Sequence, residues 1–260
     1  MSLDIHINPM TQFCNKSLCI SVVSHEQDEL VDSFLESVSL WCQSDRLVVI
    51  VVRNTMKPSG YTFTRFPFSV TILQNSRPKG FGANHNQAFS MCQEDFFCVI
   101  NPDILLTSDP FDQLISLVSI EKVGIAAPVL VDSSGRLQDS ARLFPTPGRI
   151  ISRVFCRRGV ECDYPQSKDC ISPDWVAGMF MVFPSHVYEK IGGFDDRYFM
   201  YCEDADICMR LRTRGYKVLV NTQVSAVHNP RRSSHRSLMH FWWHLISLLR
   251  FFLRYPFYTL

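Results

Sequence analysis

The chain has 260 residues, of which 46% are hydrophobic and 20% are charged, and its formal net charge is +1. This length and composition fit one large globular domain, and they exclude a fibrous or wholly disordered chain. A net charge so close to zero predicts no nucleic acid partner. The charge is uneven, however, because no Asp or Glu follows Asp206, whereas nine Lys and Arg residues do.

The first residues contain no apolar stretch of the kind that marks a secretory signal, and residues 1–16 show no periodicity. We therefore treat residues 1–16 as an N-terminal extension. The ten cysteines are scattered, and several stand within apolar runs. Such cysteines are typical of reduced, buried side chains, so a cytoplasmic location is expected.

Short apolar runs alternate with helical periodicity through the first half of the chain. Five runs have the length and β-branching of buried strands: 18–23, 47–52, 69–73, 96–100 and 123–127. Helices are predicted over 26–41, from about 80 to 92, and from 109 onward. Strands alternating with helices predict an α/β fold with a doubly wound, mixed but mostly parallel sheet flanked by helices.

Ligands of doubly wound sheets bind beyond the C-terminal ends of the strands. The polar or glycine-rich residues at these predicted ends are Ser24, Asn54, the loop Gly80–Asn86 and Asn101-Pro102-Asp103. A carboxylate at Asp103 could hold a divalent cation that bridges phosphates, although Asn-Pro-Asp also favours an ordinary turn. Gly80 and Gly82 offer backbone N–H groups to an anion at a helix start, or they form a tight turn.

The second half is less regular. Prolines interrupt residues 142–174, which predicts a long loop of the lid or substrate-binding kind. A strand is predicted over 175–183, a short helix over 184–190, and two strand segments over 216–220 and 226–228. His228 ends the last segment, either as a structural histidine or as a metal ligand.

Three carboxylates crowd into the four positions Glu203 to Asp206. Asp204, Ile207, Cys208 and Leu211 follow the i, i+3, i+4, i+7 pattern, which predicts a helix starting near Glu203. Acidic residues favour the first turn of any helix, and Asp206 with Arg210 could form a plain surface ion pair. The cluster alone therefore leaves a structural and a catalytic interpretation open.

The motifs become specific in combination. Their order is Gly-Phe-Gly-x-x-x-Asn from Gly80, Asn-Pro-Asp from Asn101, Trp-Val-Ala-Gly from Trp175, Gly-Gly-Phe-Asp-x-x-Tyr-Phe-Met-Tyr-Cys-Glu-Asp-x-Asp from Gly192, and then His228. This series resembles the family 2 glycosyltransferases of GT-A fold, and within them the bacterial rhamnosyltransferases of O-antigen and cell-wall polysaccharide assembly. The resemblance covers roughly residues 17 to 250.

The resemblance implies an inverting transfer of a sugar, L-rhamnose from dTDP-L-rhamnose, to a glycan or polyprenyl-linked acceptor. Asp204 would be the general base, with Glu203 as the second candidate, and Asp103 and His228 would hold Mg²⁺ or Mn²⁺. The donor would contact Ser24, Asn54, Gly80, Gly82, Asn86, Asn101, Asp103 and Arg231. The acceptor side would include Trp175, Gly178 and Asp206. Residues 17–130 would form the nucleotide-binding half, and residues 131–230 the acceptor-binding half.

Two positions depart from the family pattern. Asn101 stands where the first acid of an Asp-x-Asp metal motif is usual, and Arg53 stands where an acid usually precedes Asn54. Because of these departures, the chain could instead be a protein that binds nucleotide sugars and has lost catalytic residues. The intact carboxylate cluster at 203–206 argues against such a loss. A related transferase for another sugar also stays open. A sugar nucleotidyltransferase would need a Gly-rich loop after the first strand, and Ser24-His25-Glu26 is unlike one.

Residues 231–260 form a basic, amphipathic segment for which a helix is predicted. Its apolar stripe consists of Leu238, Phe241, Trp242, Leu245, Leu248, Leu249 and Phe252. The stretch is too short to span a bilayer and is interrupted by His244 and Arg250. We expect residues 238–254 either to contact the inner face of the plasma membrane peripherally or to pack against the domain or a second copy in a homodimer.

Overall fold

The structure is a computed structural model that describes residues 16–42, 46–150, 169–229 and 238–256. The first half contains β1 (Leu18–Ser24), α1 (Asp28–Trp41), β2 (Leu47–Arg53), β3 (Ser69–Gln74), α2 (Phe81–Phe89), β4 (Phe96–Ile100), β5 (Ile104–Leu105), α3 (Phe111–Val118) and β6 (Val123–Val131). The second half contains β7 (Ala141–Arg142), β8 (Cys170–Ile171), β9 (Trp175–Val176), β10 (Phe180–Pro184), α5 (Ser185–Ile191), α6 (Glu203–Thr213), β11 (Lys217–His228) and α7 (Leu238–Arg254).

The predicted mixed sheet is present. Its strands follow the order β3-β2-β1-β4-β10-β6-β11-β5, with β8 paired to β11, and β7 and β9 form a separate two-stranded sheet. The neighbours β3-β2-β1-β4 and β6-β11 are parallel, whereas β10 lies antiparallel between β4 and β6. One sheet therefore runs across the boundary between the two predicted halves.

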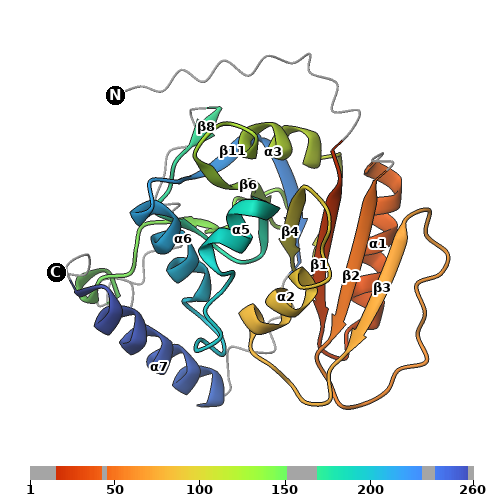
Figure 1. Ribbon diagram of the computed structural model, residues 1–260, viewed down its shortest axis with the longest axis horizontal. Helices are drawn as coiled ribbons and strands as arrows, with labels where there is room; N and C mark the ends of the chain where they lie inside the picture. Colours follow the sequence, from red (N-terminus) through yellow and green to blue (C-terminus); the bar gives the residue numbers. More distant parts are fainter. Residues whose placement is uncertain (1–15, 43–45, 151–168, 230–237, 257–260) are drawn as a thin grey trace.

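The helices lie in two layers on the two faces of the sheet (Figure 1). One layer buries apolar side chains of α1 and α3, among them Val31, Phe34 and Leu114. The other layer buries side chains of α2, α5, α6 and α7, such as Tyr188 and Phe251. Strands between two layers are covered on both faces, which is why they appear in the sequence as continuous apolar runs.

The run at 175–183 was predicted as one strand, and the structure divides it. β9 ends at Val176 and β10 begins at Phe180, so Ala177, Gly178 and Met179 lie between strands of two different sheets. In the opposite sense, the predicted segments 216–220 and 226–228 belong to one strand, β11, whose pairing with β6 shifts between Asn221 and Ser225.

The helix predicted from Glu203 is confirmed as α6, with Ile207, Cys208 and Leu211 fully buried. Gly215 follows the helix with φ +80°, a conformation that glycine adopts without steric cost. The preceding loop has tighter constraints. Gly193 has φ +62°, and a Cβ there would lie 2.3 Å from Oδ1 of Asn86.

α7 packs on the domain through a different stripe from the predicted one. Its buried residues are Ser247 and Phe251. The predicted stripe is largely exposed, as shown by Leu238 (80%), Phe241 (62%) and Leu249 (57%). Within the described ranges, no helix is long and apolar enough to cross a membrane.

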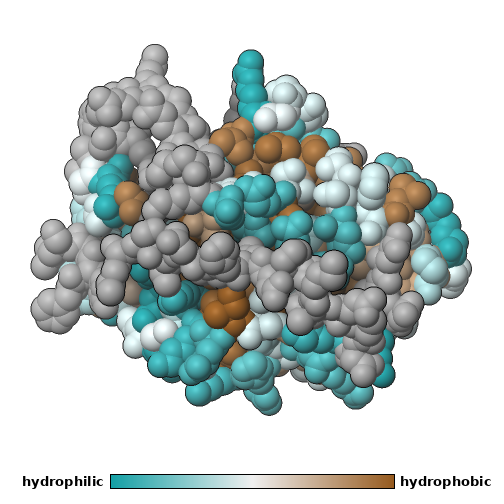
Figure 2. Space-filling model, turned by 90° about the horizontal axis from the view of Figure 1, so that it is seen from above, coloured by the Kyte–Doolittle hydropathy of each residue, from teal (hydrophilic) through white to brown (hydrophobic). Residues whose placement is uncertain are grey.

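α7 lies on the lower side of Figure 1, toward which β1, β2 and β3 run. The face of the molecule at the top of Figure 1 has hydrophilic and hydrophobic residues interspersed (Figure 2).

Candidate active site

A cluster of buried amides joins the C-terminal ends of β2 and β3 to the start of α2. Nδ2 of Asn75 donates to Oδ1 of Asn54 (3.0 Å) and to Oδ1 of Asn84 (2.7 Å). Oδ1 of Asn54 also accepts the N–H of Lys79 (2.7 Å), and Nδ2 of Asn54 donates to the Lys79 carbonyl (2.9 Å). Asn54 therefore shapes the loop before Gly80. No sequence signal identifies Asn75, because its side chain acts through residues that only the fold brings close to it.

Ser24 acts locally at the end of β1. Its hydroxyl donates to Oδ1 of Asp28 (2.8 Å) and accepts the N–H of Gln27 (3.2 Å), which ties down the start of α1. Asp28 also forms an ion pair with Arg53 (3.1 Å), whose side chain is only 7% exposed. The unusual arginine before Asn54 is therefore paired with an acid on α1.

A cavity of about 440 Å³ opens beside these residues, and its lining includes Glu26, Gln27, Arg53, Thr55, Lys57 and Tyr61. All of them lie in or follow the ends of β1 and β2, where a doubly wound sheet binds its ligands. Position after a predicted strand was the one sequence signal that could have identified them. Lys57 bonds to Glu26 (2.9 Å), so the wall carries both charges.

Gly80, Gly82 and Asn86 contact the loop that precedes α6. A Cβ on Gly80 would lie 2.6 Å from the Phe199 carbonyl oxygen, and one on Gly82 would lie 2.5 Å from Cβ of Phe194. Oδ1 of Asn86 accepts the Tyr188 hydroxyl (2.8 Å) and the N–H of Phe194 (2.9 Å). These residues were predicted to contact the donor, and the structure places them at a tight junction between α2 and the loop.

Asp103 and His228 lie together although 125 positions separate them. Nε2 of His228 is 3.5 Å from Oδ2 of Asp103, and Oδ1 of Asp103 is buried without a hydrogen-bond partner. Nδ1 of His228 is hydrogen-bonded to Oε1 of Gln138, and Nε2 of Gln138 donates to the His228 carbonyl (2.8 Å). Asn101 is half-buried, and its N–H donates to the Met179 carbonyl (3.0 Å).

Asp204 is held at the first turn of α6. Its Oδ2 accepts the N–H of Gly178 (3.1 Å), and its Oδ1 accepts the N–H of Ala205 (2.8 Å). Burial raises the pKa of Asp204, and these backbone donors and the charge of Arg142 oppose that rise. A carboxylate with a raised pKa is a better proton acceptor.

Glu203 differs from its neighbour. It is 5% exposed, and its Oε2 is buried without a hydrogen-bond partner. Burial, and then the charge of Asp204, raise the pKa of Glu203 well above its usual value. Of the two candidates, Asp204 is the more accessible and the better supplied with donors that stabilise an anion.

The two carboxylate motifs meet at the break between β9 and β10. Gly178 donates to Asp204, and Met179, the next residue, accepts from Asn101 at the end of β4. A Cβ on Gly178 would lie 3.8 Å from Cβ of Asp204 and 3.0 Å from the Phe81 ring. Asp204 therefore lies at the same edge of the sheet as the Asn101–Asp103 turn.

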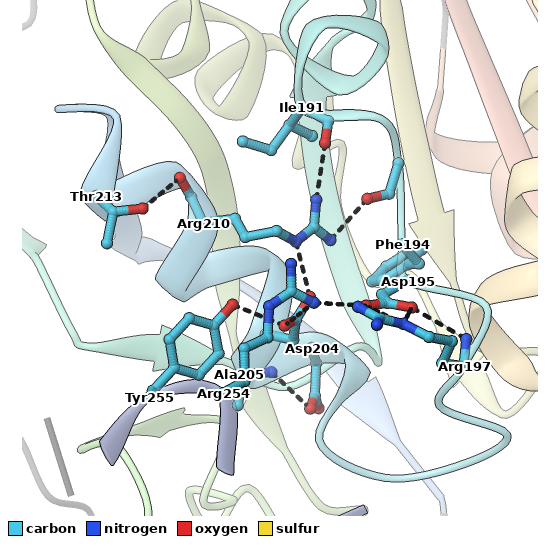
Figure 3. A network of polar contacts seen from close by, with 12 residues as sticks. Ile191, Phe194, Asp195, Arg197, Asp204, Ala205, Arg210, Thr213, Arg254 and Tyr255 are labelled. Carbon is cyan, nitrogen blue, oxygen red and sulfur yellow. Dashed lines mark hydrogen bonds and ion pairs between the residues drawn. The ribbon is translucent and has the colours of Figure 1, made fainter. Parts of the chain in front are cut away.

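Asp206 was predicted to line the acceptor side, and the structure places it in the protein interior. It is 0% exposed, and its oxygens contact Nε of Arg210 (2.7 Å), the Tyr255 hydroxyl (2.8 Å) and Nη1 of Arg254 (3.1 Å) (Figure 3). Arg210 also donates to the carbonyls of Ile191 (2.8 Å) and Gly193 (2.7 Å). Both carboxylate oxygens of Asp206 therefore have partners within the protein, and its ion pair with Arg210 is buried rather than on the surface.

Trp175 is largely buried at 9% exposure, and its indole N–H donates to the Leu143 carbonyl (3.0 Å). The Arg142 guanidinium lies over the indole ring, 5.0 Å from its centroid. The Trp175 ring therefore presents little surface to a ligand. Arg231, the remaining predicted donor contact, lies outside the described residues.

One further group of potential metal ligands occurs in the described part of the chain, formed by Cys19, Cys92 and Glu94. Cys19 is the second residue of β1, at the end of the strand away from the predicted site. Its contact with Cys92, together with burial, raises the pKa of the Cys19 thiol. The same contact lowers the pKa of the Cys92 thiol.

The chain is similar to known proteins over nearly its whole length. The family model described as glycosyltransferase like family 2 matches residues 17–246. The rhamnosyltransferase WbbL of Escherichia coli (strain K12) is 28% identical over 249 residues, which cover 90% of this chain and 92% of that protein. The N-acetylglucosaminyl-diphospho-decaprenol L-rhamnosyltransferase of Mycobacterium tuberculosis (strain H37Rv) is 24% identical over 244 residues, covering 84% and 78%.

Solved structures share the fold at low identity. The mannosyltransferase PcManGT of Pyrobaculum calidifontis, in complex with GDP-Man and Mn²⁺, matches with a TM-score of 0.63 and 16% identity. GalNAc-T7 with UDP, GalNAc and Mn²⁺ matches with a TM-score of 0.70 and 12% identity. Each match covers 92% of this chain, but only 64% and 48% of the respective solved chains. These likenesses confirm the expected GT-A type fold.

Proposed function

Because the chain belongs to glycosyltransferase family 2, we propose that it transfers L-rhamnose from dTDP-L-rhamnose, with inversion, to a lipid-linked acceptor in surface glycan synthesis. The sugar and the acceptor class rest on similarity to the two rhamnosyltransferases. The observation that carries the mechanism is the junction at Gly178 and Met179, which links the Asp204 carboxylate to the Asn101–Asp103 turn.

The donor nucleotide would occupy the cavity beside Arg53 and Thr55. The cavity is bounded by the ends of β1 and β2, and Asn54 orients the loop that leads from there to Gly80. Pairing of Arg53 with Asp28 leaves that wall without an isolated buried charge. The diphosphate would extend from the cavity toward Asp103.

A divalent cation fits the pair formed by Asp103 and His228. The buried, unpartnered Oδ1 of Asp103 is an oxygen ligand without a protein donor, and Gln138 fixes the orientation of the imidazole ring. When bound, Mg²⁺ or Mn²⁺ would neutralise charge on the donor diphosphate. The substitution of Asn101 for the first acid leaves Asp103 as the carboxylate of this turn.

The proposed chemistry is a single displacement at the anomeric carbon. Asp204 accepts the proton of the acceptor hydroxyl as that oxygen bonds to the anomeric carbon. The bond from this carbon to the diphosphate oxygen breaks on the opposite side, and dTDP leaves with the electron pair. The raised pKa of Asp204 suits this role, because general bases contribute about 10²–10⁴-fold when positioned and matched in pKa.

The exposed face of α7 suggests how a lipid-linked acceptor is reached. Leu238, Phe241, Trp242, Leu245, Leu249 and Leu253 are between 45% and 80% exposed. α7 contains Arg250 and Arg254 and no Asp or Glu, a composition that favours an anionic lipid surface. We infer that α7 lies in the surface of an anionic bilayer. Pairing of two such faces in a homodimer is the alternative.

Vesicle flotation tests this inference. The paired variant Leu245→Ser/Leu249→Ser should float less with vesicles of phosphatidylglycerol than the wild type, and both proteins should float poorly with neutral vesicles. Unchanged flotation together with a loss of dimer in sedimentation would instead assign the face to a second copy.

Substitution of Asp204 tests the transfer mechanism. Asp204→Asn should lower transfer of rhamnose to an N-acetylglucosaminyl diphospholipid by about 10²-fold or more, while dTDP binding is retained. Asp112→Asn, an exposed first-turn residue of α3, is the matched control and should remain active. Turnover near the wild-type rate in Asp204→Asn would remove Asp204 from the mechanism.

A further inference from the structure

The loop that delivers Glu203 and Asp204 has an unusual backbone. Tyr201 has φ +72° and Cys202 has φ +63°, so two consecutive residues other than glycine lie in the left-handed region. Such conformations are strained and persist where the surrounding structure enforces them. They also set the direction in which α6 begins, because Cys202 is its N-cap and its carbonyl accepts the N–H of Asp206 (2.8 Å).

α7 contacts this loop residue by residue along its inner face. The Ser247 hydroxyl donates to the Met200 carbonyl (2.8 Å), and Ser247 is only 3% exposed. The other contacts are the Tyr201 hydroxyl with Nδ1 of His240 (2.9 Å), the Phe199 ring with Trp243 (4.7 Å between centroids), and the Tyr198 ring with the Arg250 guanidinium (5.5 Å).

The far end of α7 is anchored to α6. The Tyr255 hydroxyl, just past the helix, donates to Asp206, and Arg254 contacts Asp206 and Asp195 (Figure 3). The helix therefore spans the loop from its middle at Met200 to the first turn of α6. Each of the four consecutive loop residues 198–201 contacts a residue of α7. Two of these contacts are hydrogen bonds, which fix the position of the loop more closely than burial of apolar surface does.

We propose that α7 is a positioning element for the Asp204 carboxylate, and that Ser247 and His240 hold the segment 200–202, which contains the strained Tyr201 and Cys202 and orients that carboxylate. This proposal rests on the proposed function of Asp204 as the general base. A misplacement of about 1 Å in a reacting group can cost about 10²-fold in rate, so a small relaxation of the loop is sufficient to affect turnover. The exposed face of the same helix is free to contact a bilayer while the inner face holds the loop.

The test is Ser247→Ala in the full chain, with Ser37→Ala as the matched control. Ser37 is also a buried helical serine that donates to a backbone carbonyl, that of Phe34 (2.7 Å), and it lies on α1 in the other layer. Ser37 also accepts the N–H of Leu106 (3.2 Å), so Ser37→Ala should lose at least as much thermal stability as Ser247→Ala. Only Ser247→Ala should lower kcat, by about tenfold, with the KM for dTDP-L-rhamnose within twofold of the wild-type value. His240→Ala should shift kcat in the same direction.

Hydrogen exchange gives a second measurement that does not depend on turnover. Amides of 200–206 should exchange faster in Ser247→Ala than in the wild type, and Ser37→Ala should leave them unchanged. Wild-type kcat and unchanged exchange in Ser247→Ala would overturn the positioning role, even if Asp204→Asn is inactive. Activity of Asp204→Asn would instead overturn the proposed base, and the exchange measurement would still decide whether α7 holds the loop.

Discussion

The two sides of the site hold their polar residues in different ways. At the ends of β2 and β3, the neutral amides of Asn54, Asn75 and Asn84 tie the strands to the start of α2. At the start of α6, the charged pair of Asp206 and Arg210 ties this helix to the end of α5, and Arg254 ties it to α7. Neutral amides cost less to bury than charges, whereas a buried ion pair becomes costly when one partner is lost. The two sides should therefore respond differently to substitution.

The largest effect is expected at Asp206. Asp206→Ala leaves Arg210 and Arg254 without their shared carboxylate, and loss of one partner of a buried pair costs about 3–5 kcal/mol. Urea unfolding would measure this loss, with Asp112→Ala as the exposed control for the same substitution. Equal losses in the two variants would mean that the buried network contributes no more than a surface carboxylate.

A smaller effect is expected from Asn84→Ala. Asn84 is 1% exposed, accepts from Asn75, and donates to the carbonyls of Gly80 (2.8 Å) and Lys79 (3.2 Å). Leaving these groups unpaired costs about 1–3 kcal/mol, with no dependence on pH because no charge is involved. Urea unfolding at pH 5 and pH 8 would measure both the size of the loss and its independence of pH. Gln93→Ala, a substitution at an exposed residue, is the control. A loss that matches Asp206→Ala would remove the contrast between the two sides.

Asp103→Ala tests the function of the site, through nucleotide binding, rather than the stability of the fold. We expect about tenfold weaker binding of dTDP, equal to about 1.4 kcal/mol, together with loss of the response to Mn²⁺. Calorimetric titration with and without Mn²⁺ would measure both. Asp132→Ala, which removes a turn carboxylate bonded to Ser134 and Arg136, is the control. Unchanged dTDP affinity in Asp103→Ala would reduce Asp103 to a turn residue.

The smallest effect concerns Glu203 and depends on pH. The pKa of Glu203 is raised in the folded state, so its contribution to stability is fully present below about pH 4.5, its ordinary pKa, and is lost as the pH rises through the folded pKa. Glu203→Gln carries no charge and avoids this loss. Its stability relative to the wild type should therefore increase between pH 4 and pH 8. A constant difference in thermal unfolding across this range would mean that folding does not raise the pKa of Glu203.

Several features of the fold follow from local sequence. The apolar runs that became β1, β2 and β4 are continuous because helices cover both faces of the sheet, and they were predicted to within one or two residues. The start of α6 at Glu203 was predicted from the 3.6-residue period. The family motifs added the pairing of Asp103 with His228, which periodicity cannot supply.

The main strands and helices of the first half, and the residues at the strand ends, could be predicted because both depend on neighbouring residues in the chain. The difference in accessibility between the Asp204 and Asp206 carboxylates depends on contacts with segments distant in the sequence. Asp204 and Asp206 are two positions apart, yet one bonds to the backbone of Gly178 and the other is enclosed by Arg210, Arg254 and Tyr255. The same holds for α7, whose inner face was determined by contact with the loop at Met200 rather than by its most hydrophobic stripe. Contacts between distant segments leave no periodic signal, so only the folded chain shows them.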